Sequence, residues 1–208
     1  MLKVLVCVSG GGTNLQAILD RAKAKELGDV EIVRVISNNA NAYALTRAEN
    51  NNIQTEVIRR KDYEKFEDYD KALTNLLVSK GIDLVVLAGF MTILGTTVIS
   101  EFRNRIINIH PSLIPSFCGE GFYGLRVHEG ALEKGVKVTG ATAHFVNEIC
   151  DGGPIIIQKA VEIQNGDTPE ILQKRVMEQA EWKILPKAVS LFCEDKIKVI
   201  DNKTEILE

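Results

Sequence analysis

An asparagine and a histidine two positions apart end one of the predicted strands of this 208-residue chain. They are Asn108 and His110, and because side chains alternate along a strand they should share one face while Ile109 points to the other. Pro111 follows and ends the strand. An amide beside an imidazole can stabilise an oxyanion and move a proton. The pattern alone also fits a hydrogen-bonded asparagine beside a structural histidine.

An aspartate in a flexible loop is the natural partner for this histidine. Asp151 opens the sequence Asp-Gly-Gly-Pro before the last long predicted strand. Placed near His110 it would hold the imidazolium and raise its pKa, although a plain turn aspartate is the default interpretation. His128 and His144 are interpreted as structural. The chain has no H-E-x-x-H motif, cysteine–histidine cluster or G-x-S-x-G motif, so neither metal catalysis nor a serine nucleophile is expected.

The sequence Ser-Gly-Gly-Gly-Thr-Asn at residues 9–14 connects the first predicted strand to the first predicted helix. Glycines let backbone N–H groups turn toward a ligand, and a helix N-terminus favours an anion. Leu15 replaces the third glycine of the dinucleotide fingerprint, and the Walker lysine is absent. We therefore expect Gly12, Thr13 and Asn14 to hold a single phosphate. A tight turn without a ligand is the alternative.

Apolar runs and helical patterns alternate along the chain, which predicts a mostly parallel α/β sheet with right-handed crossovers. Strands are expected at residues 3–8, 31–37, 54–58, 84–88, 105–109, 138–145 and 155–161. Helices are expected at residues 15–25, 43–51, 62–80, 125–134 and 167–192, and an edge strand plus tail at 196–208. Asp167 should cap the last helix, with Glu170 completing a capping box. Ligands of such sheets bind at the carboxyl edge of the strands.

Composition narrows the class of protein. The formal net charge is −3 and the pI about 5.7, which argues against a general nucleic-acid or membrane-surface binder. Four dispersed cysteines with no C-x-x-C pair argue against a disulfide framework and against a structural zinc site. The apolar start is too short for a signal peptide or a spanning helix, so we expect a cytoplasmic protein.

Five segments together resemble the phosphoribosylglycinamide formyltransferases, a folate-dependent family of purine synthesis. They are SGGGTNLQAI (9–18), VLAGFMTIL (86–94), NIHPSLIPSF (108–117), VTGATAHFVNEICDGGPIIIQ (138–158) and GDTPEILQKRV (166–176). The resemblance implies a single-domain, Rossmann-like α/β formyltransferase fold over 1–208, with a mostly parallel central sheet flanked by helices. Residues 1–100 would form the phosphate- or nucleotide-binding half and 101–208 the catalytic and folate-binding half.

The resemblance also implies an activity: transfer of the formyl group of 10-formyltetrahydrofolate to the amine of glycinamide ribonucleotide, with no metal. The implied catalytic residues are Asn108, His110 and Asp151. The implied substrate-binding residues are Gly12, Thr13, Asn14, Glu178 and Glu181. The implied folate-binding residues are Met91, Thr92, Ile93, Leu94, Asn108, Asn147, Glu148, Ile149, Cys150 and Asp151. The expected partners are these two small molecules, with no nucleic acid or membrane, and the chain would act as a monomer or homodimer.

Four departures from the family pattern stand out. Thr92 and Phe66 stand where arginines are frequent, and Lys65 or Arg60 could replace them at the folate's glutamate tail. Trp182 follows Glu181 where the family usually has histidine, and one extra residue precedes that pair. The loop 118–124 is longer than in many relatives.

Three other functions compete with this interpretation. A formyltetrahydrofolate hydrolase shares the Asn-x-His and Asp elements but carries an N-terminal regulatory domain. A methionyl-tRNA formyltransferase would need a C-terminal RNA-binding domain and a basic surface. A non-catalytic nucleotide-binding protein could use the same sheet, because fold does not fix function.

Overall fold

A seven-stranded sheet forms the centre of the computed structural model, which describes residues 1–207. The strand order is β3-β2-β1-β4-β5-β6-β7, in which β1 to β5 are parallel, β6 is antiparallel to β5 and β7 is antiparallel to β6. The strands are β1 (Leu2–Val8), β2 (Val30–Ser37), β3 (Gln54–Val57), β4 (Leu84–Leu87), β5 (Ile106–His110), β6 (Val138–Phe145) and β7 (Ile155–Glu162). The mostly parallel α/β sheet expected from the sequence is thus confirmed.

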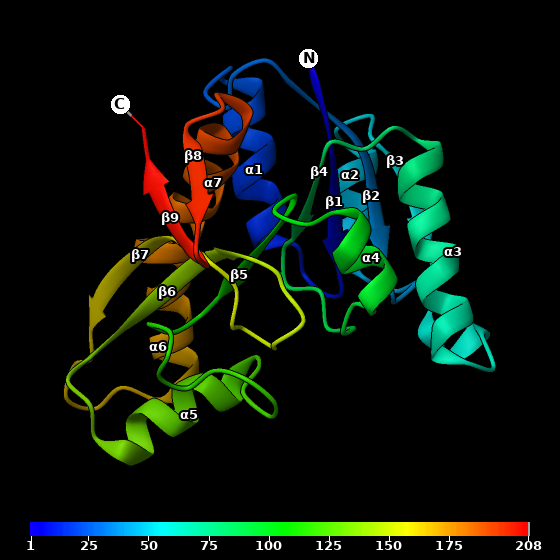
Figure 1. Ribbon diagram of the computed structural model, residues 1–208. Coiled ribbons are helices and arrows are strands. Elements are labelled where there is room, and N and C mark those ends of the chain that lie inside the picture. Colours follow the sequence, from blue (N-terminus) through cyan, green and yellow to red (C-terminus); the bar gives the residue numbers. More distant parts are fainter. Residues whose placement is uncertain (208) are drawn as a thin grey trace.

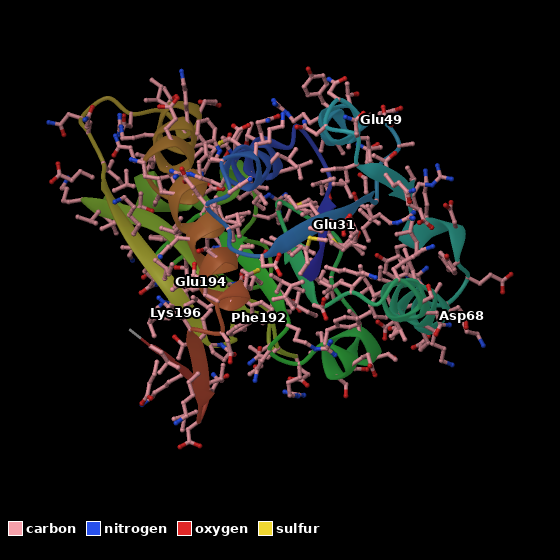
Figure 2. The ribbon with its side chains drawn as sticks, turned by 90° about the horizontal axis from the view of Figure 1, so that it is seen from above. Glu31, Glu49, Asp68, Phe192, Glu194 and Lys196 are labelled. Atoms are coloured by element: carbon pink, nitrogen blue, oxygen red, sulfur yellow. The ribbon has the colours of Figure 1, made fainter. Side chains whose placement is uncertain are left out.

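Helices cover both faces of the sheet, so residues 4–8 of β1 and all of β4 are apolar and buried (Figure 2). The helices are α1 (Thr13–Lys23), α2 (Tyr43–Glu49), α3 (Phe66–Ser79), α4 (Thr96–Glu101), α5 (Leu125–Lys134), α6 (Pro169–Val176) and α7 (Trp182–Cys193). Among residues 1–207, none of the helices is long and apolar enough to cross a membrane.

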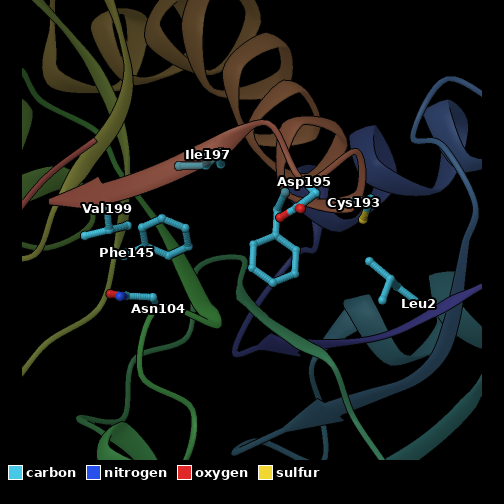
Figure 3. A pocket seen from close by; sticks show the side chains of 8 residues that line it. Leu2, Asn104, Phe145, Cys193, Asp195, Ile197 and Val199 are labelled. Atoms are coloured by element: carbon cyan, nitrogen blue, oxygen red, sulfur yellow. The ribbon is translucent and has the colours of Figure 1, made fainter. Parts of the chain in front are cut away.

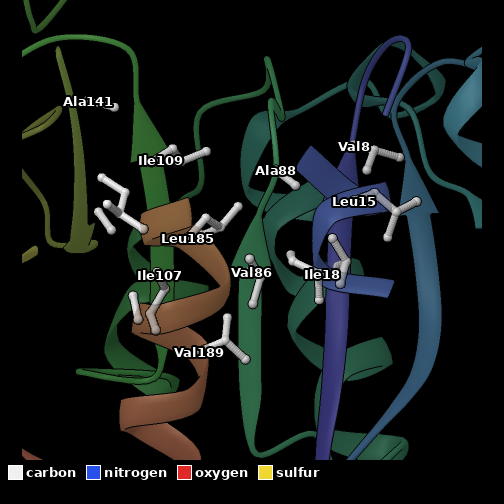
Figure 4. Close-up of a cluster of buried hydrophobic side chains, with 14 of the residues drawn as sticks. Val8, Leu15, Ile18, Val86, Ala88, Ile107, Ile109, Ala141, Leu185 and Val189 are labelled. Atoms are coloured by element: carbon white, nitrogen blue, oxygen red, sulfur yellow. The ribbon is translucent and has the colours of Figure 1, made fainter. Parts of the chain in front are cut away.

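Two apolar clusters hold the layers together. In the first, Leu15 and Ile18 of α1 and Leu185 and Val189 of α7 pack on side chains of β4 and β5 (Figure 4). The second lies on the opposite face beneath α3 and α4, and its largest fully buried side chains are Tyr69 and Phe102. Helices whose apolar stripes face the sheet therefore fix the strand ends from both sides.

The sheet reverses its strand order at β1, because β2 lies on one side of it and β4 on the other. Ligands of α/β sheets bind outside the carboxyl ends of the strands at such a switch point. The segments leaving β1 and β4 meet there, where the Met91 N–H donates to Ser9 Oγ at 2.8 Å. The predicted phosphate turn and the predicted folate segment are thus joined directly.

Three sequence-based expectations about elements were wrong. Thr168, not Asp167, caps α6: its Oγ1 accepts a hydrogen bond from the Ile171 N–H, while Asp167 pairs with Arg175. The expected single helix over 167–192 is interrupted by a π-helical turn at Met177–Glu181. The expected edge strand is instead a separate two-stranded hairpin, β8 (Ile197–Ile200) and β9 (Lys203–Ile206).

Helices α3 and α4 also differ from the expectation. The helix predicted over 62–80 begins at Phe66, after a 3-10 turn at Arg60–Asp62. Helix α4 was not predicted, because its six residues are too few to show a helical period.

Asp70 holds the start of α4, which follows the predicted folate segment. This aspartate is 3% exposed on α3, and its carboxylate accepts hydrogen bonds from the N–H groups of Thr97 (2.8 Å) and Val98 (3.3 Å). Asp70 thus acts as the N-terminal cap of α4. Gly95 occupies the cap position, but it has no side chain that could accept these hydrogen bonds.

We expect Asp70→Ala to lower the free energy of unfolding by roughly 1–3 kcal/mol, because two N–H groups at the start of α4 lose their acceptor. Urea denaturation followed by circular dichroism measures the loss. Lys71→Ala is the control, since Lys71 is the exposed neighbour of Asp70 on α3. Equal stabilities of the two variants would contradict this role.

Candidate active site

The register between β5 and β6 places the catalytic candidate Asn108 opposite a histidine. Asn108 lies directly opposite His144 in the antiparallel pair, and Asn108 Nδ2 donates to His144 Nε2 at 3.1 Å. His144 Nδ1 lies 2.8 Å from the Phe145 carbonyl oxygen. A carbonyl only accepts, so Nδ1 carries a ring proton. His144 thereby fixes the orientation of the Asn108 amide.

His110 lies between two oxygen acceptors at the end of β5. Its Nε2 donates to the Phe117 carbonyl at 2.8 Å, and its Nδ1 lies 3.5 Å from Asp151 Oδ2. The side chain is only 6% exposed. Burial lowers the pKa of His110 below its ordinary value, while the Asp151 carboxylate and the Phe117 carbonyl act to raise it. The surroundings of both ring nitrogens suit the protonated form.

Asp151 joins both histidines. Its Oδ1 lies 3.6 Å from His144 Nε2, and its Oδ2 accepts the Gly119 N–H at 2.8 Å. Burial opposes ionisation, but His144, His110 and the Gly119 N–H together hold the pKa of Asp151 below its usual value. Asp151 is therefore a carboxylate within reach of His110, as the sequence interpretation required.

The interpretation of His144 as merely structural missed its contacts with Asn108 and Asp151. The alternation of β6 puts His144 on the same face as Thr142, but only the strand register shows that it lies opposite Asn108. His128 on α5 is fully buried and neither of its ring nitrogens has a hydrogen-bond partner among the described residues. Burial, with a smaller contribution from His110, lowers its pKa to about 4, so this ring is neutral near pH 7.

The glycine-rich turn has the backbone that a phosphate cradle needs. Gly12 adopts a left-handed conformation (φ 73°), and a Cβ there would lie 2.6 Å from the Cβ of Ala44. The first N–H groups of α1, including those of Thr13 and Asn14, follow immediately, and no side chain caps them. Arg47 adds a cation beside the turn, because its Nε donates to the Gly11 carbonyl at 2.8 Å.

A buried carboxyl group faces the same helix. Glu181 Oε2 accepts a hydrogen bond from Asn14 Nδ2 at 2.6 Å, although 167 positions separate the two residues. Burial raises the pKa of Glu181 to about 7. Asn14 Oδ1 is buried and has no partner among the described residues, so it is available to a ligand hydroxyl. Glu178, the other predicted substrate residue, is exposed and lies 3.9 Å from Lys174 Nζ.

The π turn before Trp182 places Glu181 toward Asn14. A π turn holds one residue more than an α-helical turn requires, and such turns are frequent at functional sites. The extra residue noted in the sequence ahead of the Glu-Trp pair is thus accommodated inside the helix.

The predicted folate residues divide into exposed and buried groups. Met91, Ile93 and Ile149 expose large apolar side chains at 54%, 67% and 68%, which suits contact with an aromatic ligand. Leu94 is buried in the core beneath α3, so its side chain supports the segment from below. Thr92 Oγ1 accepts a hydrogen bond from Asn38 Nδ2 at 2.7 Å.

The second predicted folate segment is the β6–β7 loop. Asn147 Nδ2 donates to the Gly152 carbonyl at 3.1 Å, and Glu148 pairs with Arg103. Cys150 is a free, exposed cysteine whose Sγ lies 3.9 Å from Asp151 Oδ2.

Arg60, a candidate replacement for the missing arginines, stacks over the Phe66 ring with 5.7 Å between the guanidinium carbon and the ring centroid. Within residues 1–207, no group of three or more His, Cys, Asp and Glu side chains is arranged to hold a metal ion.

Comparison with known proteins agrees with these observations. The formyl transferase family model matches residues 2–189. Phosphoribosylglycinamide formyltransferase of Haemophilus influenzae is 40% identical over 97% of this chain and 92% of its own length. Trifunctional purine biosynthetic protein adenosine-3 of Gallus gallus is 42% identical over 95% of this chain, which spans only 19% of that protein.

Solved structures extend the similarity to the whole fold. Glycinamide ribonucleotide transformylase 1 from Symbiobacterium toebii superposes with a TM-score of 0.94 at 40% identity, covering 100% of this chain and 95% of that one. A formyltetrahydrofolate deformylase from Pseudomonas syringae superposes with a TM-score of 0.89 at 31% identity, and the match covers 66% of that chain. The resemblance noted in the sequence is confirmed, and the chain belongs to the formyl transferase family.

Proposed function

We propose that this protein transfers the formyl group of 10-formyltetrahydrofolate to the amine of glycinamide ribonucleotide, a step of purine synthesis. The observation that carries this proposal is the single network formed by Asn108, His144, Asp151 and His110 at the end of β5. The glycine-rich turn and Glu181 lie at the neighbouring end of β1, where a phosphorylated ribose would fit.

The reaction would proceed by direct transfer. The amine attacks the formyl carbon and forms a tetrahedral adduct, whose oxyanion accepts hydrogen bonds from the Asn108 amide and protonated His110. His110 Nε2 already donates to the Phe117 carbonyl, so the formyl oxygen would take the place of that carbonyl. Asp151 would keep His110 charged and help carry a proton, through water, to the departing folate nitrogen.

Both halves of the chain would contribute to the ligand sites, with Glu181 of the second half on the ribonucleotide and Met91 and Ile93 of the first half on the folate. Residues 1–100 contribute Gly12, Thr13 and Asn14 for the nucleotide phosphate and ribose, while 101–208 contribute the catalytic groups. The exposed apolar side chains of Met91, Ile93 and Ile149 would contact the folate's ring system.

Hydrolysis of formyltetrahydrofolate is the second candidate, because the Pseudomonas syringae deformylase shares the fold. Product formation from 10-formyltetrahydrofolate, followed spectroscopically with and without glycinamide ribonucleotide, separates the two reactions. Turnover that requires the ribonucleotide supports the transferase, and equal turnover without it supports the hydrolase. Binding of the ribonucleotide without any turnover would favour a non-catalytic protein.

Asn108→Ala and His110→Ala should each reduce kcat by about a hundredfold or more, because each removes a donor to the oxyanion. Both variants should fold, which thermal unfolding would verify. Steady-state assays at saturating concentrations of both substrates measure the loss. Rates close to wild type in either variant would contradict the assigned roles.

Asp151→Asn should move the alkaline limb of the kcat–pH profile to lower pH. The Asp151 carboxylate raises the pKa of His110, so removing its charge leaves burial to lower that pKa further. Protonated His110, and with it activity, is then lost at a lower pH. Glu120→Gln is the control, because this exposed carboxylate lies in the 118–124 loop outside the network. If the alkaline limb of the kcat–pH profile lies at the same pH in Asp151→Asn as in the wild type, Asp151 does not have this electrostatic role.

Glu181→Gln should raise KM for glycinamide ribonucleotide by roughly tenfold and change kcat less, because one carboxyl oxygen that can accept from the substrate becomes an amide N–H donor while the shape is kept. The KM for the folate substrate should stay near wild type. Initial-rate measurements that vary each substrate in turn distinguish the two effects, and a rise confined to the folate KM would refute the assignment.

A further inference from the structure

The loop that carries Asp151 lies against the C-terminal hairpin. The hairpin turns at Asp201 and Asn202, which both have left-handed backbones (φ 48° and 59°), between the paired residues Ile200 and Lys203. This is the two-residue turn that suits the twist of an antiparallel pair. Figure 1 shows the hairpin descending to the region where the β6–β7 loop enters β7.

Two side chains of the hairpin bind the backbone just after Asp151. Asn202 Nδ2 donates to the Gly152 carbonyl at 3.3 Å, and Thr204 Oγ1 donates to the Ile155 carbonyl at 2.5 Å. The two accepting carbonyls bracket Gly153 and Pro154. The hairpin therefore holds this segment at both of its ends.

Strand β6 holds the same segment from the other side. The Phe145 N–H donates to the Pro154 carbonyl at 2.8 Å. Gly153 is pressed so closely against β6 that a Cβ would lie 1.9 Å from the Phe145 carbonyl oxygen. Residues 152–155 are thus clamped between β6 and the hairpin.

Asp151 needs such support. Its backbone is left-handed (φ 54°), a conformation that is costly for a residue other than glycine and persists only where the surroundings impose it. Its contacts with His110 and His144 are long, at 3.5 and 3.6 Å, so a small displacement of the loop would break them.

The hairpin packs against the edge of the core through Ile197 and Val199 of β8. A cavity of about 340 Å³ lies beneath it, lined by these two side chains and by Phe145 of β6 (Figure 3). The hydrogen bonds of Asn202 and Thr204 supplement this packing and join the hairpin directly to the loop.

We propose that Asn202 and Thr204 are positioning residues for catalysis, which hold residues 152–155 so that the Asp151 carboxylate faces His110 and His144. This inference rests on the proposed role of Asp151 in formyl transfer. The hairpin is thereby part of the active-site support, although it lies outside the central sheet.

Two substitutions remove the clamp and leave the hairpin intact. Asn202→Gly deletes the amide and creates an Asp-Gly turn, which favours the same left-handed backbone. Thr204→Val deletes the hydroxyl and keeps the β-branched shape, whereas Thr204→Ser keeps the hydroxyl. Lys203→Ala is a further control on the same hairpin, because its exposed side chain makes no hydrogen bond or ion pair with any described residue.

In the double variant Asn202→Gly/Thr204→Val, kcat should fall roughly three- to tenfold through misplacement of Asp151, with KM for glycinamide ribonucleotide unchanged. The alkaline limb of the kcat–pH profile should move to lower pH. The titratable groups around His110 are Asp151, His144 and His128, and only Asp151 lies on the clamped loop. Thr204→Ser and Lys203→Ala should retain the wild-type rate and profile.

A folded double variant with unchanged kcat and an unchanged alkaline limb would overturn the clamp. The NMR titration of the His110 ring in the full-length protein without ligands gives an independent measurement, since its pKa should fall in the double variant and stay constant in Lys203→Ala. Absence of formyl transfer by the wild-type protein would refute the proposed function, whereas an unchanged His110 titration would refute the clamp.

Discussion

The antiparallel pairing of β5 with β6 is the constraint on which the site depends. It sets Asn108 opposite His144 and turns the chain back so that the following loop can bring Asp151 between two histidines. A shift of one residue in this register would send His144 to the other face of the sheet and leave the Asn108 amide without its partner. The parallel strands on the other side supply the crevice proposed for the nucleotide, but the change of direction at β6 creates the proposed catalytic network.

Burial then determines the charges of this network. A buried imidazole resists protonation and a buried carboxyl resists ionisation, so burial works against the charged form of both His110 and Asp151. Placed together, each favours the charged form of the other. Within the described part of the chain no cation pairs with Glu181, and burial raises its pKa to about 7. Two carboxyl groups in one protein thus differ in protonation because one faces histidines and the other faces an amide.

Much of this fold could be predicted from local sequence patterns. A helix or strand that buries one face needs apolar residues at a regular spacing, and that spacing can be seen in the sequence. Strand β6 and helix α5 have the predicted bounds. The role of His144 could not be predicted, since it depends on strand register. The hairpin was missed although Asp201 and Asn202 are typical turn residues between two short β-type runs. The contact between Asn14 and Glu181 joins distant parts of the chain, so no local pattern encodes it.

The π turn at 177–181 has an evolutionary consequence. A helix that can widen by one residue absorbs an insertion without rotating the segments before and after it. Helices α6 and α7 can therefore diverge in length between relatives while Glu181 keeps its contact with α1. Against a relative whose helix lacks the widened turn, a gapless alignment would misplace the glutamate by one position, and an alignment anchored on the contact with Asn14 would place it correctly.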